Sequence, residues 1–444
     1  MKRVPLLATG SLTALLLLGP AMALWLLPRP QARGLERLLP QASLLQSFPA
    51  APTRPVPQLW QQRLGPRLAE RLWREQRGVW WQFWGRDGDG GPFLALVRPA
   101  EARGPALPVA ALPVDELVVL PPDPLSRRLL ADQLRSTSRQ QRHGLEHRCM
   151  ERLQQGQAVY WSPIGLAQLT GAMAPLLQMA RQGCLSLAPS GARLLNGLDL
   201  TGEAAARAGV LGNPPTSTVA GQPPLLPVGT LLDLSGPALA PVFESLLARQ
   251  LIRDPLASRY GLAESQLKLL TGVPFRLRLR PIARGPFQAG LELQLAVGRE
   301  RKPWAALLRD LRQGLLRQNL QEAPAEITAA TPGLRSQSLP AARFVRDDGT
   351  VVGGWRWQSV GGGEPQLLLF LGPVPQGLAA PVPAQPSTAP LSLQLQPAGL
   401  SRLGLMPQGL PQLVRQARLL QLSLSPSDQP LSRLTGRLHL SVVR

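Results

Sequence analysis

The chain has 444 residues and 44% of them are hydrophobic, which is enough for a buried core and excludes a wholly disordered chain. Its 48 Lys and Arg residues outnumber its 27 Asp and Glu residues. The resulting net charge of +21 would suit a polyanion such as an acidic polysaccharide, acidic lipid headgroups or nucleic acid. Nearly all of these cations are arginines, and lysine occurs only at Lys2, Lys268 and Lys302. Because the arginines are spread along the chain, they do not indicate a dedicated basic patch.

The N-terminal residues have the pattern of a segment that anchors or exports a protein. Lys2 and Arg3 precede an uncharged, leucine-rich stretch at Val4–Pro28, and Arg29 follows it. About 25 uncharged residues can cross a membrane as a helix, while a basic start and a small-residue step also fit a cleaved signal. We therefore expect residues 1–30 to be a transmembrane anchor or signal. The rest of the chain is expected outside the cytoplasm, on the periplasmic or thylakoid-lumenal side of a membrane.

Beyond a Pro- and Ala-rich linker expected at residues 31–57, with a short helix around residues 35–45, an amphipathic helix followed by strands recurs along the chain. In chain order we expect helices at 59–76, 124–153, 164–180, 235–250, 303–320 and 408–420. Strands are expected at 79–84, 92–97, 158–161, 184–188, 194–200, 231–234, 275–280, 291–297, 343–346, 351–360, 366–371, 391–396, 421–425 and 437–443. The helix periodicity is clear where leucines and tryptophans recur every three or four residues, as in 59–76.

The strand at 275–280 shows its pattern most clearly. Phe275, Leu277 and Leu279 alternate with three arginines. Period-two alternation of this kind predicts a strand with one buried face and one solvent-exposed face. We therefore expect the arginines to face water.

Three helix openings resemble one another and support the idea of a repeated unit. They are Ser162-Pro163, Ser235-Gly236-Pro237 and, more loosely, Met406-Pro407. A polar residue followed by proline in the first turn is a typical helix start. The match predicts structural periodicity, although the sequence identity is too low to prove a duplication.

These elements predict an α+β fold of repeated units, each a helix with an antiparallel hairpin, preceded by a single N-terminal hydrophobic helix. The units are expected to form one or two curved sheets with helices on one face. The expected regions are a first α+β region at 58–201, a Gly/Pro-rich linker at 202–228, a second α+β region at 229–371, a Pro-rich linker or loop at 372–390, and a C-terminal strand-helix-hairpin unit at 391–444.

Two cysteines, Cys149 and Cys184, are compatible with a disulfide in an oxidising compartment. A bridge would close a loop of about 35 residues and stabilise the fold by roughly 4 kcal/mol in the chain-entropy model. Nothing in the sequence brings the two thiols together, and two buried free cysteines are the simpler alternative.

The strongest metal candidate is the segment from His143 to Cys149. His143 and His147 are four residues apart, so on a helix they would point the same way and could share a zinc ion, with Glu146 or Cys149 as a third ligand. Gly144 and the neighbouring arginines favour a solvated helix face instead. We assign no metal residue here.

Two acidic turns resemble calcium loops only superficially. Asp87 and Asp89 lie among glycines, and Asp347-Asp348-Gly349 has a similar composition. A calcium loop of the EF-hand type needs ligands up to a glutamate at position twelve, whereas Asp-Gly is also typical of a tight hairpin turn. We expect turns at both places.

Other catalytic motifs are missing from the sequence. There is no Gly-x-Ser-x-Gly elbow, no phosphate loop and no Gly-x-Gly-x-x-Gly fingerprint. The sequence therefore assigns no catalytic residue, cofactor-binding residue or cofactor.

Tryptophans gather on two predicted strands. Trp80 and Trp84 share one face of the first strand, Trp81 and Phe83 share the other, and Trp355 and Trp357 lie on a second strand. Burial between two layers explains them, and an exposed aromatic patch for a sugar, a lipid headgroup or a protein is the functional alternative.

The layout resembles uncharacterised cyanobacterial membrane-anchored proteins with a repetitive α+β exterior region, a domain of unknown function. The residues that carry the resemblance are the stretch Val4–Pro28 and the openings at Ser162-Pro163 and Ser235-Gly236-Pro237. This resemblance implies a fold and a location, and no activity or site residue.

The leading hypothesis from the sequence is a non-catalytic, membrane-tethered scaffold or binding module outside the cytoplasm. Its expected partners are the membrane, through the N-terminal helix, and an envelope protein or an anionic lipid or glycan, with no role for nucleic acid. The alternatives are an envelope hydrolase and a protein that binds polyanions or lipid surfaces through arginine-rich faces.

Overall fold

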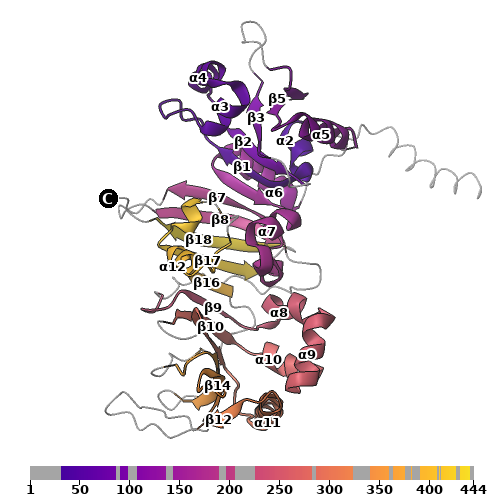
Figure 1. Cartoon of the computed structure of the whole chain (residues 1–444). Coiled ribbons are helices and arrows are strands. Elements are labelled where there is room, and N and C mark those ends of the chain that lie inside the picture. Colours follow the sequence, from indigo (N-terminus) through magenta and orange to yellow (C-terminus); the bar gives the residue numbers. More distant parts are fainter. Residues whose placement is uncertain are drawn as a thin grey trace, which may run out of the picture.

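The computed structural model describes residues 32–86, 91–98, 108–136, 144–189, 197–205, 226–282, 287–323, 341–359, 364–375, 382, 391–407, 410, 412–426 and 431–440. In these residues the expected α+β class is confirmed, because all the strands join one antiparallel sheet of eighteen strands with helices packed on it. The molecule is elongated along the direction in which the strands succeed one another (Figure 1).

The first half of the sheet comes from residues before 206. Its strands are β1 (Ala42–Phe48), β2 (Trp80–Gly85), β3 (Phe93–Val97), β4 (Leu112–Val114), β5 (Leu117–Leu120), β6 (Ala158–Trp161), β7 (Gln182–Pro189) and β8 (Gly197–Ala205). Its helices are α2 (Leu35–Leu38), α3 (Gln58–Leu64), α4 (Pro66–Glu75), α5 (Pro124–Ser136), α6 (Leu145–Gln155) and α7 (Pro163–Thr170), with 3-10 helices η1 (Leu39–Gln41) and η2 (Gly171–Ala180).

The second half comes from residues after 225. Its strands are β9 (Leu232–Gly236), β10 (Phe275–Pro281), β11 (Ala289–Leu295), β12 (Gln321–Ala323), β13 (Ala341–Val345), β14 (Val351–Gln358), β15 (Gln366–Leu371), β16 (Leu391–Leu395), β17 (Leu419–Pro426) and β18 (Ser432–His439). Its helices are α8 (Ala240–Leu247), α9 (Gln250–Tyr260), α10 (Glu264–Thr271), α11 (Lys302–Arg317), α12 (Pro397–Arg402) and α13 (Gln412–Arg415).

The strand order across the sheet shows that the two halves meet through the last strands of the chain. The order is β4–β5–β3–β2–β1–β6–β7–β8–β18–β17–β16–β9–β10–β11–β15–β14–β13–β12. The three yellow strands β16, β17 and β18 therefore lie in the middle of the molecule, where they join β8 to β9 (Figure 1).

Each half contains two units in which a strand, one or more helices and two further strands follow in order. The units are β1–β3 and β6–β8 in the first half, and β9–β11 and β16–β18 in the second. Their first strands pair with each other, as β1 with β6 and β9 with β16, and the third strands β8 and β18 pair where the halves meet. The two halves are thus related by an approximate two-fold axis between β8 and β18.

Sequence and register agree on which residues of β6–β8 and β16–β18 are equivalent. Pro163-x-Gly165-Leu166 matches Pro397-x-Gly399-Leu400, and the backbone N–H before each proline donates to the strand beside it, Ser162 to Ser43 O at 2.9 Å and Gln396 to Leu231 O at 2.8 Å. Further matches are Leu185-Ser186-Leu187-x-Pro189 with Leu422-Ser423-Leu424-x-Pro426, and Leu200-Thr201-Gly202 with Leu434-Thr435-Gly436. Hence the copy of the Ser162-Pro163 opening is Gln396-Pro397, and the predicted copy at Met406-Pro407 was wrong.

The central glycines of the two copies are required by close backbone approach. A Cβ at Gly202 would lie 1.9 Å from Cys184 O, and one at Gly436 would lie 2.1 Å from Gln421 O. Both contacts are with the neighbouring strand of the same unit, so the third strand of each copy lies against the second in the same way.

The two faces of the sheet differ, and we name them by their central residues. The apolar face is covered by helices along both halves, with α3 and α4 on β2 and β3, η2 near β8 and β17, and α8, α10, α11 and α12 on the second half. The opposite face, called the polar face, is covered by α2, α5 and α6 over the first half only. The expectation of helices on one face is therefore too simple for the first half, which has three layers.

Several predicted boundaries change in the structure. Residues 31–57 were predicted as a linker with a short helix, yet β1 lies within them and is a central strand. The predicted helix at 59–76 is divided at Gly65, whose φ of 77° starts a new helix at Pro66. The predicted boundary at 202–228 overlaps β8, and the predicted helix at 408–420 is replaced by α13 and the start of β17.

The predicted membrane-spanning helix also requires correction. Residues 4–28 lie outside the described residues, and no helix within the described part of the chain is long and apolar enough to cross a bilayer. The 16-residue helix α11 illustrates this, since it carries Lys, Arg and Asp residues along its length.

Candidate functional site

The polar face carries a continuous row of hydroxyl side chains across six neighbouring strands. In register they pair directly across the strands β7, β8, β18, β17, β16 and β9. Because strands in a sheet lie about 4.8 Å apart, these groups are evenly spaced. We call this set the hydroxyl row; its members are Ser186, Thr201, Thr435, Ser423, Ser392 and Ser235.

The row is open to solvent at its centre. Thr201 is exposed, and the other members are partly exposed. An ion pair between Arg437 and Asp199, with a 3.1 Å Nε–Oδ1 distance, lies beside it on the same face. Within the described residues, the helices of the second half pack on the apolar face or against helices that do, so none covers the row.

Helix α6 bounds the row on the side of the first half. Arg152 forms a bidentate pair with Glu203, at 2.8 and 2.7 Å, and its Nη1 donates to Ser186 Oγ at 3.2 Å. The same helix is joined to β7 by a disulfide between Cys149 and Cys184, so the simpler expectation of two free cysteines was wrong. The guanidinium therefore holds the first hydroxyl of the row in place.

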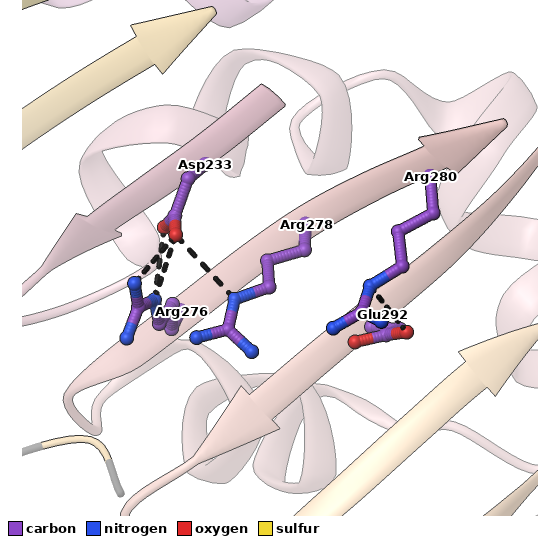
Figure 2. A network of polar contacts seen from close by, with 5 residues as sticks. All are labelled: Asp233, Arg276, Arg278, Arg280 and Glu292. Carbon is purple, nitrogen blue, oxygen red and sulfur yellow. Dashed lines mark hydrogen bonds and ion pairs between the residues drawn. The ribbon is translucent and has the colours of Figure 1, made fainter. Parts of the chain in front are cut away.

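On its other side the row leads into a group of buried charges, shown in Figure 2. Arg276 Nε lies 3.0 and 2.9 Å from the two carboxylate oxygens of Asp233, and its Nη2 lies 2.6 Å from Oδ2. Arg278 Nε contacts the same Oδ2 at 3.4 Å, and Arg280 Nε pairs with Glu292 at 3.0 Å. These five residues and Arg356 on β14 make up a set of six that we call the arginine ladder.

Four members of the ladder are buried, including Arg278, which was predicted to face water. Arg278 is 4% exposed, Arg356 5%, Asp233 5% and Glu292 6%. Burial is the main reason that the pKa of Arg278 is lowered, and the charge of Arg276 adds to it, while Asp233 and Glu292 act in the opposite direction. Burial likewise lowers the pKa of Arg356, opposed by Glu292 and assisted by Arg280. The prediction that the arginines of β10 face water was wrong for Arg278, whose burial is permitted by acidic partners on neighbouring strands, while Arg276 and Arg280 are partly exposed.

Glutamine side chains continue the polar face beyond the ladder. Gln294 Nε2 and Gln366 Oε1 are in hydrogen-bond contact, and Gln366 exchanges two hydrogen bonds with the backbone of Val382, at 2.7 and 3.0 Å. Arg356 Nη1 donates to Pro375 O at 3.2 Å. Backbone from the segment after β15 thus lies on this part of the face.

The predicted zinc constellation is not assembled. His143 lies outside the described residues, Cys149 is consumed by the disulfide, and His147 Nε2 contacts Glu151 at 3.5 Å. Among the described residues no three His, Cys, Asp or Glu side chains come together in a way that could hold a metal ion.

The acidic turns were predicted as hairpin turns, and one of them can be checked. Residues 347–349 form a turn between β13 and β14, in which Asp348 Oδ1 accepts the Thr350 N–H at 2.9 Å and Gly349 has a φ of 77°. Hydrogen bonds from Thr350 lower the pKa of the Asp348 carboxyl. Asp87 and Asp89 lie outside the described residues.

The tryptophans belong to the core, so the alternative of an exposed aromatic patch is wrong for most of them. Trp80, Trp81, Trp355 and Trp357 are 4–8% exposed. Trp80 packs against Trp60 and Trp73 on the apolar face, and Trp81 donates to Leu153 O at 2.9 Å on the opposite face. Two-sided burial of β2 is confirmed.

Sequence reasoning missed both the hydroxyl row and the ladder. The only available signals were the alternating arginines of residues 275–280 and the repeated Leu-Thr-Gly of β8 and β18. The chain matches no family model, none of the curated proteins and none of the solved structures. The geometry of the polar face is therefore the basis for the function proposed below.

Proposed function

We propose that this chain is a non-catalytic binding module that acts outside the cytoplasm and holds an extended, hydroxyl-rich ligand, a glycan, along its polar face. The observation that carries this proposal is the hydroxyl row, which presents six evenly spaced donor-acceptor groups and which, among the described helices, only α6 borders, at its Ser186 end. Each Ser or Thr hydroxyl can donate one hydrogen bond and accept others, which suits sugar hydroxyls.

The shape of the sheet supports a polymeric ligand more than a small one. The row crosses six strands, so it extends about 24 Å at the usual strand spacing. Residues beside it add charged and amide groups, such as the Asp199–Arg437 pair and Gln421. A chain molecule laid across the strands would meet the same chemistry at each step.

The extracytoplasmic location rests on the disulfide. Cys149 and Cys184 are both fully buried and bonded to each other. Structural disulfides persist in oxidising compartments and are rare in the cytosol.

The experiment that tests the proposal is calorimetric titration of the full chain with a panel of soluble glycans, a neutral glucan and an N-acetylglucosamine polymer. We expect binding to at least one of them. The double variant Thr201→Val and Thr435→Val removes two hydroxyls with little change in shape. Losing two hydrogen bonds should weaken binding about 10- to 30-fold.

The matched control is Thr53→Val, an exposed threonine in the first half away from the row. It should bind like the wild type. Absence of binding to every glycan of the panel, or equal binding by the double variant, would overturn the proposal.

A further inference from the structure

Four charged residues flank the two threonines at the centre of the hydroxyl row. The strands β8 and β18 share the segment Leu-Thr-Gly, which Asp199 and Glu203 flank on β8 and which Arg433 and Arg437 flank on β18. Residues two positions apart on a strand point to the same face, so all four charges lie on the polar face beside the row. The register places Arg437 opposite Asp199 and Arg433 opposite Glu203.

Of these two opposed pairs, one is formed. Arg437 Nε lies 3.1 Å from Asp199 Oδ1. Glu203 pairs instead with Arg152 of α6, whose Nε and Nη2 lie 2.8 and 2.7 Å from its two carboxylate oxygens. In the part of the chain that the structure describes, the guanidinium of Arg433 has neither an ion pair nor a hydrogen bond. Both carboxylates beside the central threonines are therefore engaged, and one positive charge is left over.

The unpaired guanidinium lies where a ligand on the row would meet it. Arg433 is exposed, and it precedes Thr435 by two positions, which is about 7 Å along the strand. At its two ends the row meets Arg152 and Arg276, and each of these arginines forms a bidentate pair with a carboxylate. The excess positive charge beside the row therefore lies at its centre.

We propose that the glycan bound along the hydroxyl row is acidic, and that Arg433 selects it by receiving the carboxylate of a uronic acid residue. This inference rests on the proposed function. The fixed fork of a guanidinium matches the two oxygens of a carboxylate. In a uronic acid the carboxylate and the hydroxyls belong to one sugar ring. A sugar that is hydrogen-bonded to the central threonines can therefore present its carboxylate to Arg433.

The experiment that tests this selectivity compares two ligands that differ in charge alone. The full chain is titrated calorimetrically with an oligogalacturonate and with its fully methyl-esterified form, which keeps the ring hydroxyls but is neutral. The acid should bind about 5- to 10-fold more tightly, because it adds a charge-assisted hydrogen bond at a solvent-exposed position.

Two variants separate the role of Arg433 from the general attraction of a chain with a net charge of +21 for polyanions. Arg433→Gln should bind the acid and the ester equally and keep the wild-type affinity for the ester. The matched control is Arg71→Gln, which removes the same charge from an exposed position on α4, a helix on the apolar face. The control should keep the full preference for the acid.

The outcomes distinguish this inference from the function on which it rests. Equal binding of acid and ester by the wild type overturns the inference and leaves glycan binding standing. Binding of neither form overturns the inference and the proposed function together. A preference that survives in Arg433→Gln, or that is lost equally in Arg71→Gln, overturns the assignment to Arg433.

Discussion

The two halves of this sheet bury different kinds of side chain on their polar face: apolar side chains in the first half and charged ones in the second. Leu45, Phe83 and Phe93 of the first half are 0–5% exposed, and their counterparts Asp233, Arg278 and Glu292 are 4–6% exposed. Both sets are equally buried. The apolar set lies under α2, α5 and α6, whereas the charged set is held by ion pairs.

The difference teaches how one architecture tolerates two kinds of interior. Apolar side chains are stabilised by the area they bury, with little dependence on any one partner. A buried ion pair depends on each partner, because removing one charge strands the other. A new buried charge should therefore destabilise the first half, and the loss of an existing buried charge should destabilise the second half.

The largest expected effect comes from placing the second half's chemistry in the first. Leu45→Asp puts a carboxylate between Phe83 and Tyr160, inside a cluster of buried hydrophobic side chains. We expect the free energy of unfolding to fall by about 5 kcal/mol or more. Urea denaturation followed by circular dichroism measures it, with Thr201→Asp at an exposed position of the same face as the control. Similar small losses in both variants would contradict the comparison.

The reverse change removes a charge from the second half. Asp233→Asn leaves Arg276 and Arg278 buried without their carboxylate, and the loss should be about 3–5 kcal/mol. Asp199→Asn provides the matched control, since Asp199 and Arg437 are 39% and 50% exposed and their pair should be worth about 0–1 kcal/mol. Equal losses in the same denaturation experiment would show that the ladder charges are not energetically coupled.

The disulfide should stabilise the first half alone. Cys149→Ala with Cys184→Ala opens a loop with a sequence separation of 35 and should cost roughly 2–4 kcal/mol. Hydrogen exchange should speed up in α6 and β7, while β10 and β11 keep their protection. Faster exchange in both halves at once would mean that the sheet unfolds as a single unit.

The smallest effect concerns Tyr160, which lies beside the disulfide. Burial is the main cause that raises the pKa of Tyr160 to about 12. The unfolded chain loses this proton near pH 10, whereas the folded chain keeps it until about pH 12, so stability falls as pH rises through that window. The loss should reach about 2–3 kcal/mol.

Tyr160→Phe isolates this contribution. The variant loses the hydrogen bond from Gln182 at every pH, but it should lack the additional fall between pH 10 and 12. Chemical denaturation at pH 9 and pH 11.5 measures the difference. Parallel losses in wild type and variant would assign the alkaline sensitivity to other groups.

Local signals predicted much of the fold. Ser162-Pro163 was predicted to begin a helix, and the Ser162 side chain does accept the Gly165 N–H at 3.3 Å. Alternation identified β10, and the paired strands β14 and β15 were also predicted. The strand β1 was missed because it is flanked by prolines and covered on both faces, so it shows no alternation.

The candidate sites could not be predicted, for a different reason. The carboxylate of Asp233, which pairs with Arg276, is 43 residues away in the sequence. The hydroxyl row likewise combines strands from residue 186 to residue 435. Periodicity shows which side chains share a face of one strand, but only the register shows which strands are neighbours. That information is carried by the whole sheet.

The position of the final strands has a consequence for how the molecule is made. The strand β8 forms early in synthesis, but its partner β18 follows more than two hundred residues later, as the 238-residue separation of Arg437 and Asp199 shows. One backbone edge of β8 stays unpaired until β18 is made, and one edge of β9 stays unpaired until β16 is made, so both can pair with strands of other chains. Ribosomes that stall before residue 390 should therefore release a product prone to aggregate, and a chaperone that shields strand edges would help most at this stage.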